Sequence, residues 1–181
     1  MTDLPTDWYL DPKITGGGGF LDIGIHAMDA LRWLAGSEPL TVYATVGNMV
    51  NDGLGNEDFG VATYEFENGV VATLSAGWAN PDHSPTWLDV KFEILTTTGV
   101  FIINKPHHDL ALYTNESASR VAWLKPDTNR QIDAFAKTIT EDLDPPITAR
   151  DGIVALAMGL GAYESSKRGD TVEIAALIAE A

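Results

Sequence analysis

The chain has 181 residues and a formal net charge of −15, from 11 basic and 26 acidic side chains. This acidity argues against nucleic acid or an anionic membrane surface as a partner, because both attract basic proteins. The chain contains no cysteine, which excludes disulfides, thiol nucleophiles and zinc–thiolate sites and fits a reducing compartment. Residues 1–7 have no basic segment or apolar core, and no apolar run approaches a membrane span, so we expect a cytoplasmic globular protein without a signal peptide.

The first predicted element is a helix over residues 21–35. A run of four glycines, residues 16–19, leads directly into it, and Gly36 is its natural stop. Most side chains of this helix are apolar, which is typical of a helix that is largely buried. The glycines are either a plain turn that lets the helix pack closely or a segment where the backbone approaches a ligand.

Three polar side chains of this mostly apolar helix share one face. Asp22, His26 and Asp29 occur at spacings i, i+4 and i+7, which places them on one face. A carboxylate beside a histidine can hold an imidazole and tune it for proton transfer, although a buried pair could simply satisfy itself. A metal ion bound by all three is a weak alternative, because they spread over roughly 10 Å of helix. We therefore expect no metal site.

Residues 40–125 have the composition of strands. The predicted strands cover residues 42–46, 59–66, 70–74, 87–95, 100–103, 110–113 and 121–124. Asn68 and Gly69 mark a hairpin between the second and third strands. Consecutive strands joined by short turns, with no helices between them, predict an antiparallel sheet.

The C-terminal third is helical again. A helical pattern over residues 132–143 is followed by a second helix, which Thr148 and Asp151 open as a capping box and Gly169 ends. Residues 172–174 are predicted to add an edge strand. The predicted fold is therefore α+β: a large, mostly antiparallel sheet covered on one face by about three helices, in a single domain over residues 1–181.

A sheet covered on one face leaves the other face open. Side chains such as Val42, Tyr64 or Trp123, depending on register, would then need burial, and a large exposed apolar face usually marks an interface. We therefore expect a homo-oligomer, most simply a two-fold dimer that packs sheet face to sheet face.

Two segments of the chain resemble a known family. Residues 8–12 and 16–29 are similar to the G-G-G-x-h-x-D-x-G-x-H-x-x-D segment of the Gfo/Idh/MocA oxidoreductases. The Asn68-Gly69 hairpin, the strand pair joined through Gly99, and residues 146–152 and 162–166 also match. The resemblance covers nearly the whole chain, and the segment with Asp22 and His26 is its most specific part.

The resemblance implies roles for particular residues. His26 would be the acid/base that takes the proton from a substrate hydroxyl, and Asp22 would orient it and stabilise its charge. Lys13, Trp78 and His83 are the candidate substrate contacts; His83 lies in a proline-containing loop that could be exposed or could form the wall of a sugar pocket.

The family's nucleotide-binding half has no counterpart in this sequence. A G-x-G-x-x-G fingerprint would need a glycine where Leu21 stands. We therefore expect the substrate-binding C-terminal domain of an NAD(P)-dependent dehydrogenase that acts on a sugar, polyol or related CH–OH substrate, without its N-terminal Rossmann domain. Alone it is expected to bind no NAD or NADP and to be inactive. The alternative is a non-catalytic carbohydrate-binding or scaffold module of the same fold.

Overall fold

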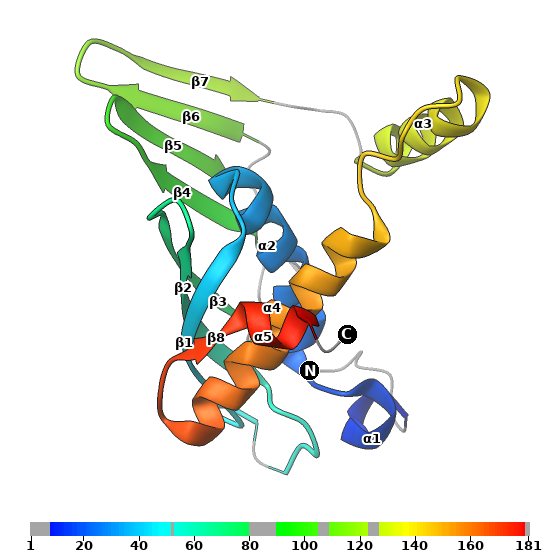
Figure 1. Cartoon of the computed structure of the whole chain (residues 1–181). Coiled ribbons are helices and arrows are strands. Elements are labelled where there is room, and N and C mark those ends of the chain that lie inside the picture. The colour runs from blue at the N-terminus through cyan, green and yellow to red at the C-terminus, as the bar shows by residue number, and fades with distance from the viewer. Residues whose placement is uncertain (1–7, 52, 80–89, 105–108, 123–126, 180–181) are drawn as a thin grey trace. The chain divides into compact units, whose positions relative to one another are not determined.

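The structure is a computed structural model that describes residues 8–51, 53–79, 90–104, 109–122 and 127–179 (Figure 1). The chain divides into two compact units. The first unit comprises Met1–Asp82 and Ile147–Ala181, and the second unit comprises His83–Pro146. Each unit contains one four-stranded antiparallel sheet. The helix with Asp22 and His26 belongs to the first unit.

The sheet of the first unit has the strand order β3-β2-β1-β8. Its strands are β1 (Pro39–Gly47), β2 (Phe59–Phe66), β3 (Val71–Gly77) and β8 (Val172–Glu173). Side chains alternate between its two faces: Val42, Ala44, Ala62 and Tyr64 are buried, whereas Tyr43 is 52% exposed. This alternation sets the register, because a shift of one residue would move every buried side chain to the open face.

Three helices cover the buried face of this sheet: α2 (Gly19–Ala35), α4 (Ala149–Arg168) and α5 (Ile174–Ala179) (Figure 1). Two short helices, η1 (Trp8–Leu10) and α1 (Pro12–Thr15), precede α2. The largest fully buried apolar side chains between helices and sheet are Phe20, Met28, Val42, Tyr64, Phe66, Val154, Met158 and Ile174. The first unit therefore has one continuous hydrophobic core, on which α2 rests along its length.

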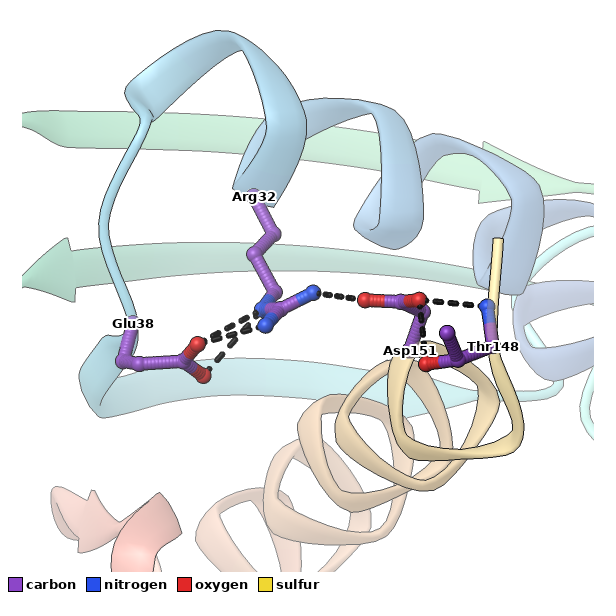
Figure 2. Close-up of polar contacts among 4 residues, drawn as sticks. All are labelled: Arg32, Glu38, Thr148 and Asp151. Carbon is purple, nitrogen blue, oxygen red and sulfur yellow. Dashed lines mark hydrogen bonds and ion pairs between the residues drawn. The ribbon is translucent and has the colours of Figure 1, made fainter. Parts of the chain in front are cut away.

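An ion-pair network joins the C-terminal end of α2 to two other elements (Figure 2). The Arg32 guanidinium lies 2.5 Å from the Glu38 carboxylate, just before β1, and 2.5 Å from Asp151 in the first turn of α4. Asp151 also accepts a hydrogen bond from the backbone of Thr148, which completes the expected capping box. The contacts with Thr148 and Arg32 hold the pKa of Asp151 well below its ordinary value. Gly36 ends α2 in the left-handed conformation, as predicted.

Two serines of α4 bind the edge of β1. Strand β8 pairs with only two residues of β1. Beyond them, the hydroxyl of Ser165 accepts a hydrogen bond of 2.9 Å from the backbone of Ala44. The hydroxyl of Ser166 likewise accepts from the backbone of Val46 over 2.9 Å. The serines thus satisfy backbone donors that the short strand β8 does not reach.

The second unit contains a meander of four strands in the order β4-β5-β6-β7. These strands are β4 (Lys91–Leu95), β5 (Gly99–Asn104), β6 (Asp109–Thr114) and β7 (Ala118–Ala122), and α3 (Asp127–Thr140) follows them. Among the described side chains of this unit, Ala111 is the one apolar residue that is buried. Ile132, Phe135 and Ile139 share a face of α3 and are each more than 60% exposed.

The α+β class and the antiparallel strand pairing predicted from the sequence are confirmed. The described strands are divided between two sheets, where the sequence predicted one. The helix predicted over residues 132–143 is α3 of the second unit, and the short helix α5 is the third helix on the first sheet. Residues 87–89 of the fourth predicted strand lie outside the described residues. No helix in the described part of the chain has the length and apolar character needed to cross a membrane.

Two of the side chains suggested for the open face of the sheet, Val42 and Tyr64, do not lie on it. Val42 and Tyr64 are both fully buried, because they point toward the helices of their own chain. Trp123 lies outside the described residues. The open face carries Tyr43, Val61 and Val71 instead, which are 52%, 39% and 61% exposed.

Candidate functional site

Asp22 lies in the first turn of α2, where two aromatic side chains hold its carboxylate. The indole Nε1 of Trp78 donates a hydrogen bond of 3.1 Å to Oδ2 of Asp22. The ring of Trp78 stacks on that of Tyr9, with 5.4 Å between their centroids and 26° between their planes. Burial, a hydrogen bond to Asp22 and the negative charge of Asp22 raise the pKa of Tyr9 to about 12. The Tyr9 phenol is therefore a protonated donor at neutral pH.

His26 follows Asp22 by one turn of α2. The spacing i, i+4 places both side chains on one face of the helix. The imidazole is exposed, and no residue in the described part of the chain hydrogen-bonds to it. A buried pair that satisfies itself is therefore not the arrangement found. Asp22 is bound by Trp78 and Tyr9, and its role in orienting His26 remains a prediction.

The predicted substrate contacts are only partly brought together. Trp78 directly follows β3 and contacts Asp22, so it shares the candidate site. Lys13 is exposed on α1. His83 lies outside the described residues. Tyr9, which the sequence did not single out, is the further side chain at Asp22.

Protein atoms pack closely against the glycine run. A Cβ at Gly17 would lie 2.1 Å from the Tyr163 hydroxyl, and one at Gly18 would lie 2.1 Å from the Glu57 carbonyl oxygen. A Cβ at Gly19 would lie 2.7 Å from a backbone nitrogen just after β3. These separations are far below van der Waals contact, so the chain needs glycine at all three positions. The close-packing interpretation of the glycines is the one that the geometry supports.

Glu57 lies against the start of α2 and was not predicted from the sequence as a site residue. Its carboxylate accepts a bifurcated hydrogen bond from the backbone N–H of Gly18, whose nitrogen lies 2.7 Å from both oxygens, and one of 2.7 Å from the Tyr163 hydroxyl. Burial and the Glu57 carboxylate raise the pKa of Tyr163 well above its ordinary value. A sequence signal was available: Gly18 has no side chain to cap α2, so a carboxylate from elsewhere was to be expected there.

A shallow surface pocket of about 260 Å³, open to solvent, adjoins this network. Its walls include Gly16, Gly17, Asn56, Glu57 and Tyr163. The Asn56 side chain is buried, and its amide nitrogen donates to the backbone oxygen of Tyr9 and to the hydroxyl of Thr15. Asn56 thereby ties the segment before the glycine run to the loop that precedes β2.

Asp58 is a fully buried carboxylate with a structural role. It accepts hydrogen bonds from the backbone nitrogens of Met49, Val50 and Asn51, and from the Asn51 side chain. Burial alone would raise the pKa of Asp58, but these hydrogen bonds outweigh burial and lower it. All of these donors belong to one surface loop, so the carboxylate fixes that loop and is not free to act on a ligand.

The glycine run does not fit the pyrophosphate of a dinucleotide. A phosphate site at a helix start needs free backbone N–H groups. At α2 the Gly18 N–H already binds the Glu57 carboxylate, and that negative charge would repel a phosphate. Among the described residues, no group of three or more histidine and carboxylate side chains is placed to share a metal ion.

The sequence profile of the GFO/IDH/MocA C-terminal domain matches residues 1–102, more than half of the chain. The chain belongs to the GFO/IDH/MocA family. The matched residues include α2 with its glycine run and all of β1, β2 and β3. The family resemblance found in the sequence is thus confirmed.

Relatives of this GFO/IDH/MocA domain are oxidoreductases. It is 29% identical to the uncharacterized oxidoreductase YrbE of Bacillus subtilis, over 91% of this chain and 50% of that protein. It is 27% identical to 1,5-anhydro-D-fructose reductase of Ensifer adhaerens, over 92% of this chain and 50% of the reductase. The chain therefore spans about half the length of these curated relatives.

The fold agrees with a solved structure of this kind. Aldose-aldose oxidoreductase from Caulobacter crescentus, complexed with glycerol, matches with a TM-score of 0.79 over 96% of this chain and 52% of that one. The two sequences are 20% identical, so this match bears on the fold alone.

Proposed function

We propose that this GFO/IDH/MocA domain is the substrate-binding half of an NAD(P)-dependent oxidoreductase that oxidises a CH–OH group of a sugar, polyol or related substrate. The observation that carries the proposal is the face of α2 that presents Asp22 and His26. Asp22 is held by Trp78 and Tyr9, whereas the His26 imidazole is exposed and free to meet a substrate hydroxyl. The 1,5-anhydro-D-fructose reductase among the curated relatives supports the substrate class.

In this proposal His26 acts as the acid/base. Its imidazole would take the proton from the substrate hydroxyl while a hydride leaves the carbon for NAD or NADP bound by the other domain, which is the usual part of a histidine in acid/base catalysis. Asp22 places a fixed negative charge one turn before His26 and favours the imidazolium that forms. The stacked rings of Trp78 and Tyr9 offer an apolar wall beside that charge, and Lys13 and His83 are the remaining candidates for binding hydroxyl groups.

The cofactor is assigned to another domain. NAD or NADP would bind to a Rossmann domain N-terminal to this chain, because the glycine run before α2 is closed to phosphate by Glu57. The curated relatives are about twice as long as this chain, which supports such a partner domain. Without that domain the chain is inactive. We also propose that its two compact units act together as one functional domain, and that it acts in the cytoplasm.

The open face of the first sheet supports assembly into a homo-oligomer. Tyr43, Val61 and Val71 are exposed on strands that lie side by side, and burial of such a face against a second copy is favourable. We expect light scattering at tens of micromolar to give at least twice the chain mass of 19.5 kDa. A mass of one chain would refute a stable oligomer, and Val71→Glu should reduce a stable oligomer to single chains.

The test of the reaction is a change at His26. In the complete oxidoreductase that contains this chain, His26→Ala should lower kcat by about 10²–10⁴-fold, the usual contribution of a positioned acid/base. Arg150→Ala, an exposed change in the first turn of α4, is the control and should leave kcat near normal. A near-normal rate in His26→Ala would remove His26 from the mechanism. Saturable binding of NAD or NADP by the 181-residue chain at micromolar affinity would refute the assignment of the cofactor to another domain.

A further inference from the structure

The start of α2 is held by a residue that is distant in the sequence. A helix leaves its first backbone N–H groups without intrahelical partners, and Gly18, the N-cap residue, has no side chain to satisfy them. The Glu57 carboxylate takes this place: both of its oxygens lie 2.7 Å from the nitrogen of Gly18, and one lies 3.4 Å from the nitrogen of Leu21. The backbone oxygen of Glu57 also accepts from Gly19 over 2.8 Å.

The residue that Glu57 holds is bonded directly to the candidate site. The carbonyl oxygen of Gly18 accepts the first helical hydrogen bond from the backbone nitrogen of Asp22, over 2.8 Å. Gly18 is thus fixed at its nitrogen by Glu57 and at its oxygen by Asp22. A displacement of Gly18 would move the first turn of α2, and with it the carboxylate of Asp22 and the imidazole one turn later.

Tyr163 fixes Glu57 in turn. Its hydroxyl donates to the Glu57 carboxylate over 2.7 Å, and its ring packs against that of Phe20, with 6.3 Å between the centroids. Phe20 is fully buried, so this ring contact anchors the pair to the core of the first unit. The backbone of Gly17 lies so close to the Tyr163 hydroxyl that there is no room for a Cβ. The glycine run therefore packs directly against Tyr163 and Glu57.

We propose that Glu57, held by Tyr163, is a positioning residue for the reaction at Asp22 and His26. Its carboxylate sets where α2 begins and so sets the place of both side chains relative to a bound substrate. This inference rests on the proposed function for its effect on catalysis. The geometry of the α2 start can be tested without it, because that geometry belongs to the 181-residue chain.

The first experiment compares carboxylates at the two ends of α2. Glu57→Gln removes the charge and one acceptor oxygen at the start of the helix, and Glu38→Gln does the same to the partner of Arg32 at its end. In NMR spectra of the 181-residue chain, Glu57→Gln should shift the backbone resonances of Asp22 and the imidazole resonances of His26. Glu38→Gln should leave both in place. Unchanged Asp22 and His26 signals in Glu57→Gln would overturn the proposal.

The second experiment measures kcat and KM in the complete oxidoreductase. Misplacement of a reacting group by a fraction of an ångström slows chemistry without abolishing binding, so Glu57→Gln should lower kcat by about 10- to 100-fold with a smaller change in KM. Tyr163→Phe, which removes only the hydroxyl, should give a smaller loss and remains informative if Glu57→Gln does not fold. An equal loss of kcat in Glu38→Gln would overturn the proposal, because any loosening of α2 would then suffice.

The two arms separate this inference from the proposed function. If His26→Ala leaves the rate unchanged, the assignment of the reaction fails. The NMR comparison still decides whether Glu57 positions the start of α2. If the NMR shifts appear but kcat in Glu57→Gln is normal, the positioning role in catalysis is refuted while the proposed function stands.

Discussion

The two units contain sheets of the same size and have very different interiors. The sheet of the first unit is covered by α2, α4 and α5 and buries large side chains such as Phe20, Tyr64 and Met158 completely. In the described part of the second unit, one small apolar side chain, Ala111, is buried. Strand pairing alone therefore does not make a core: a sheet buries large side chains only where another layer packs on it, here the helices of the first unit.

The first unit combines the larger core with the candidate site. Burial of apolar surface is the main source of folding free energy, so the first unit holds most of the stability of the chain together with the candidate site. In the second unit, the apolar face of α3 formed by Ile132, Phe135 and Ile139 is exposed and adds little buried surface.

The largest expected effect is at Phe20, in the core of the first unit. Phe20→Ala should lower the free energy of unfolding by about 3–5 kcal/mol, because it removes a fully buried ring and leaves a cavity. The matched control, Phe135→Ala on the exposed face of α3, should change it by no more than about 0.5 kcal/mol. Urea unfolding monitored by circular dichroism measures both. If Phe135→Ala lowered the free energy of unfolding as much as Phe20→Ala, the contrast between the two units would be wrong, since the face of α3 would then be buried in solution.

A smaller effect is expected where the first unit is packed most tightly. Gly18→Ala should lower the free energy of unfolding by about 1–3 kcal/mol, because the new methyl group collides with the Glu57 backbone. Gly152→Ala on α4 is the matched control. A methyl group there meets no atom within 4 Å, so the better helix former should stabilise the chain by about 0.5–1 kcal/mol. Equal effects of the two changes would show that the start of α2 can relax.

The third prediction concerns the stability of the first unit in acid. The pKa of Asp151 is lowered on folding from an ordinary value of 3.8, mainly by Thr148 and then by Arg32. Its contribution is therefore fully present above about pH 5 and is lost as the pH falls through the folded pKa. The difference in Tm between the wild-type chain and Asp151→Asn should shrink as the pH falls below about 4. Asp133→Asn, exposed on α3, should show no such trend. A constant difference for Asp151→Asn would contradict the network.

The smallest effect is local to the candidate site. Asp22→Asn should lower the pKa of Tyr9 from about 12 toward its ordinary value of 10.0, because a carboxylate no longer favours the protonated phenol. NMR titration of isotopically labelled tyrosine measures this pKa. Asp29→Asn, on the same helix, is the control and should leave the Tyr9 titration unchanged. If Tyr9 does not respond to Asp22→Asn, the two groups are not in contact.

The fold was largely predictable because its signals are local. Alternating apolar residues gave β2 with its correct bounds, and glycine stops gave the ends of α2 and α4. The division into two sheets was not predictable, because strand patterns do not say which strands pair beyond their neighbours in the chain. The same limit hid which face of the first sheet is covered: Val42 and Tyr64, suggested for the open face depending on register, lie on the covered face.

The candidate site was predictable only where it follows from helix periodicity. Asp22 and His26 were found because they stand out on one apolar helix. Tyr9 and Glu57 were missed because they reach the site from other elements, Glu57 from 39 residues beyond Gly18. Contacts of this kind depend on tertiary packing, which no spacing in the sequence reveals. The lack of a capping side chain at Gly18 was the one local clue to Glu57.

The serine hydroxyls of α4 that bind the edge of β1 affect how copies of this chain can associate. An uncovered strand edge is a template on which a foreign strand can add, and repeated addition builds insoluble fibres. Beyond the two residues paired with β8, the backbone donors of Ala44 and Val46 are already taken by Ser165 and Ser166. An incoming strand would have to displace a helix that is anchored in the core. Two hydroxyl groups thus occupy the free backbone donors at this edge. The strand β8 can therefore be short without leaving β1 open to aggregation.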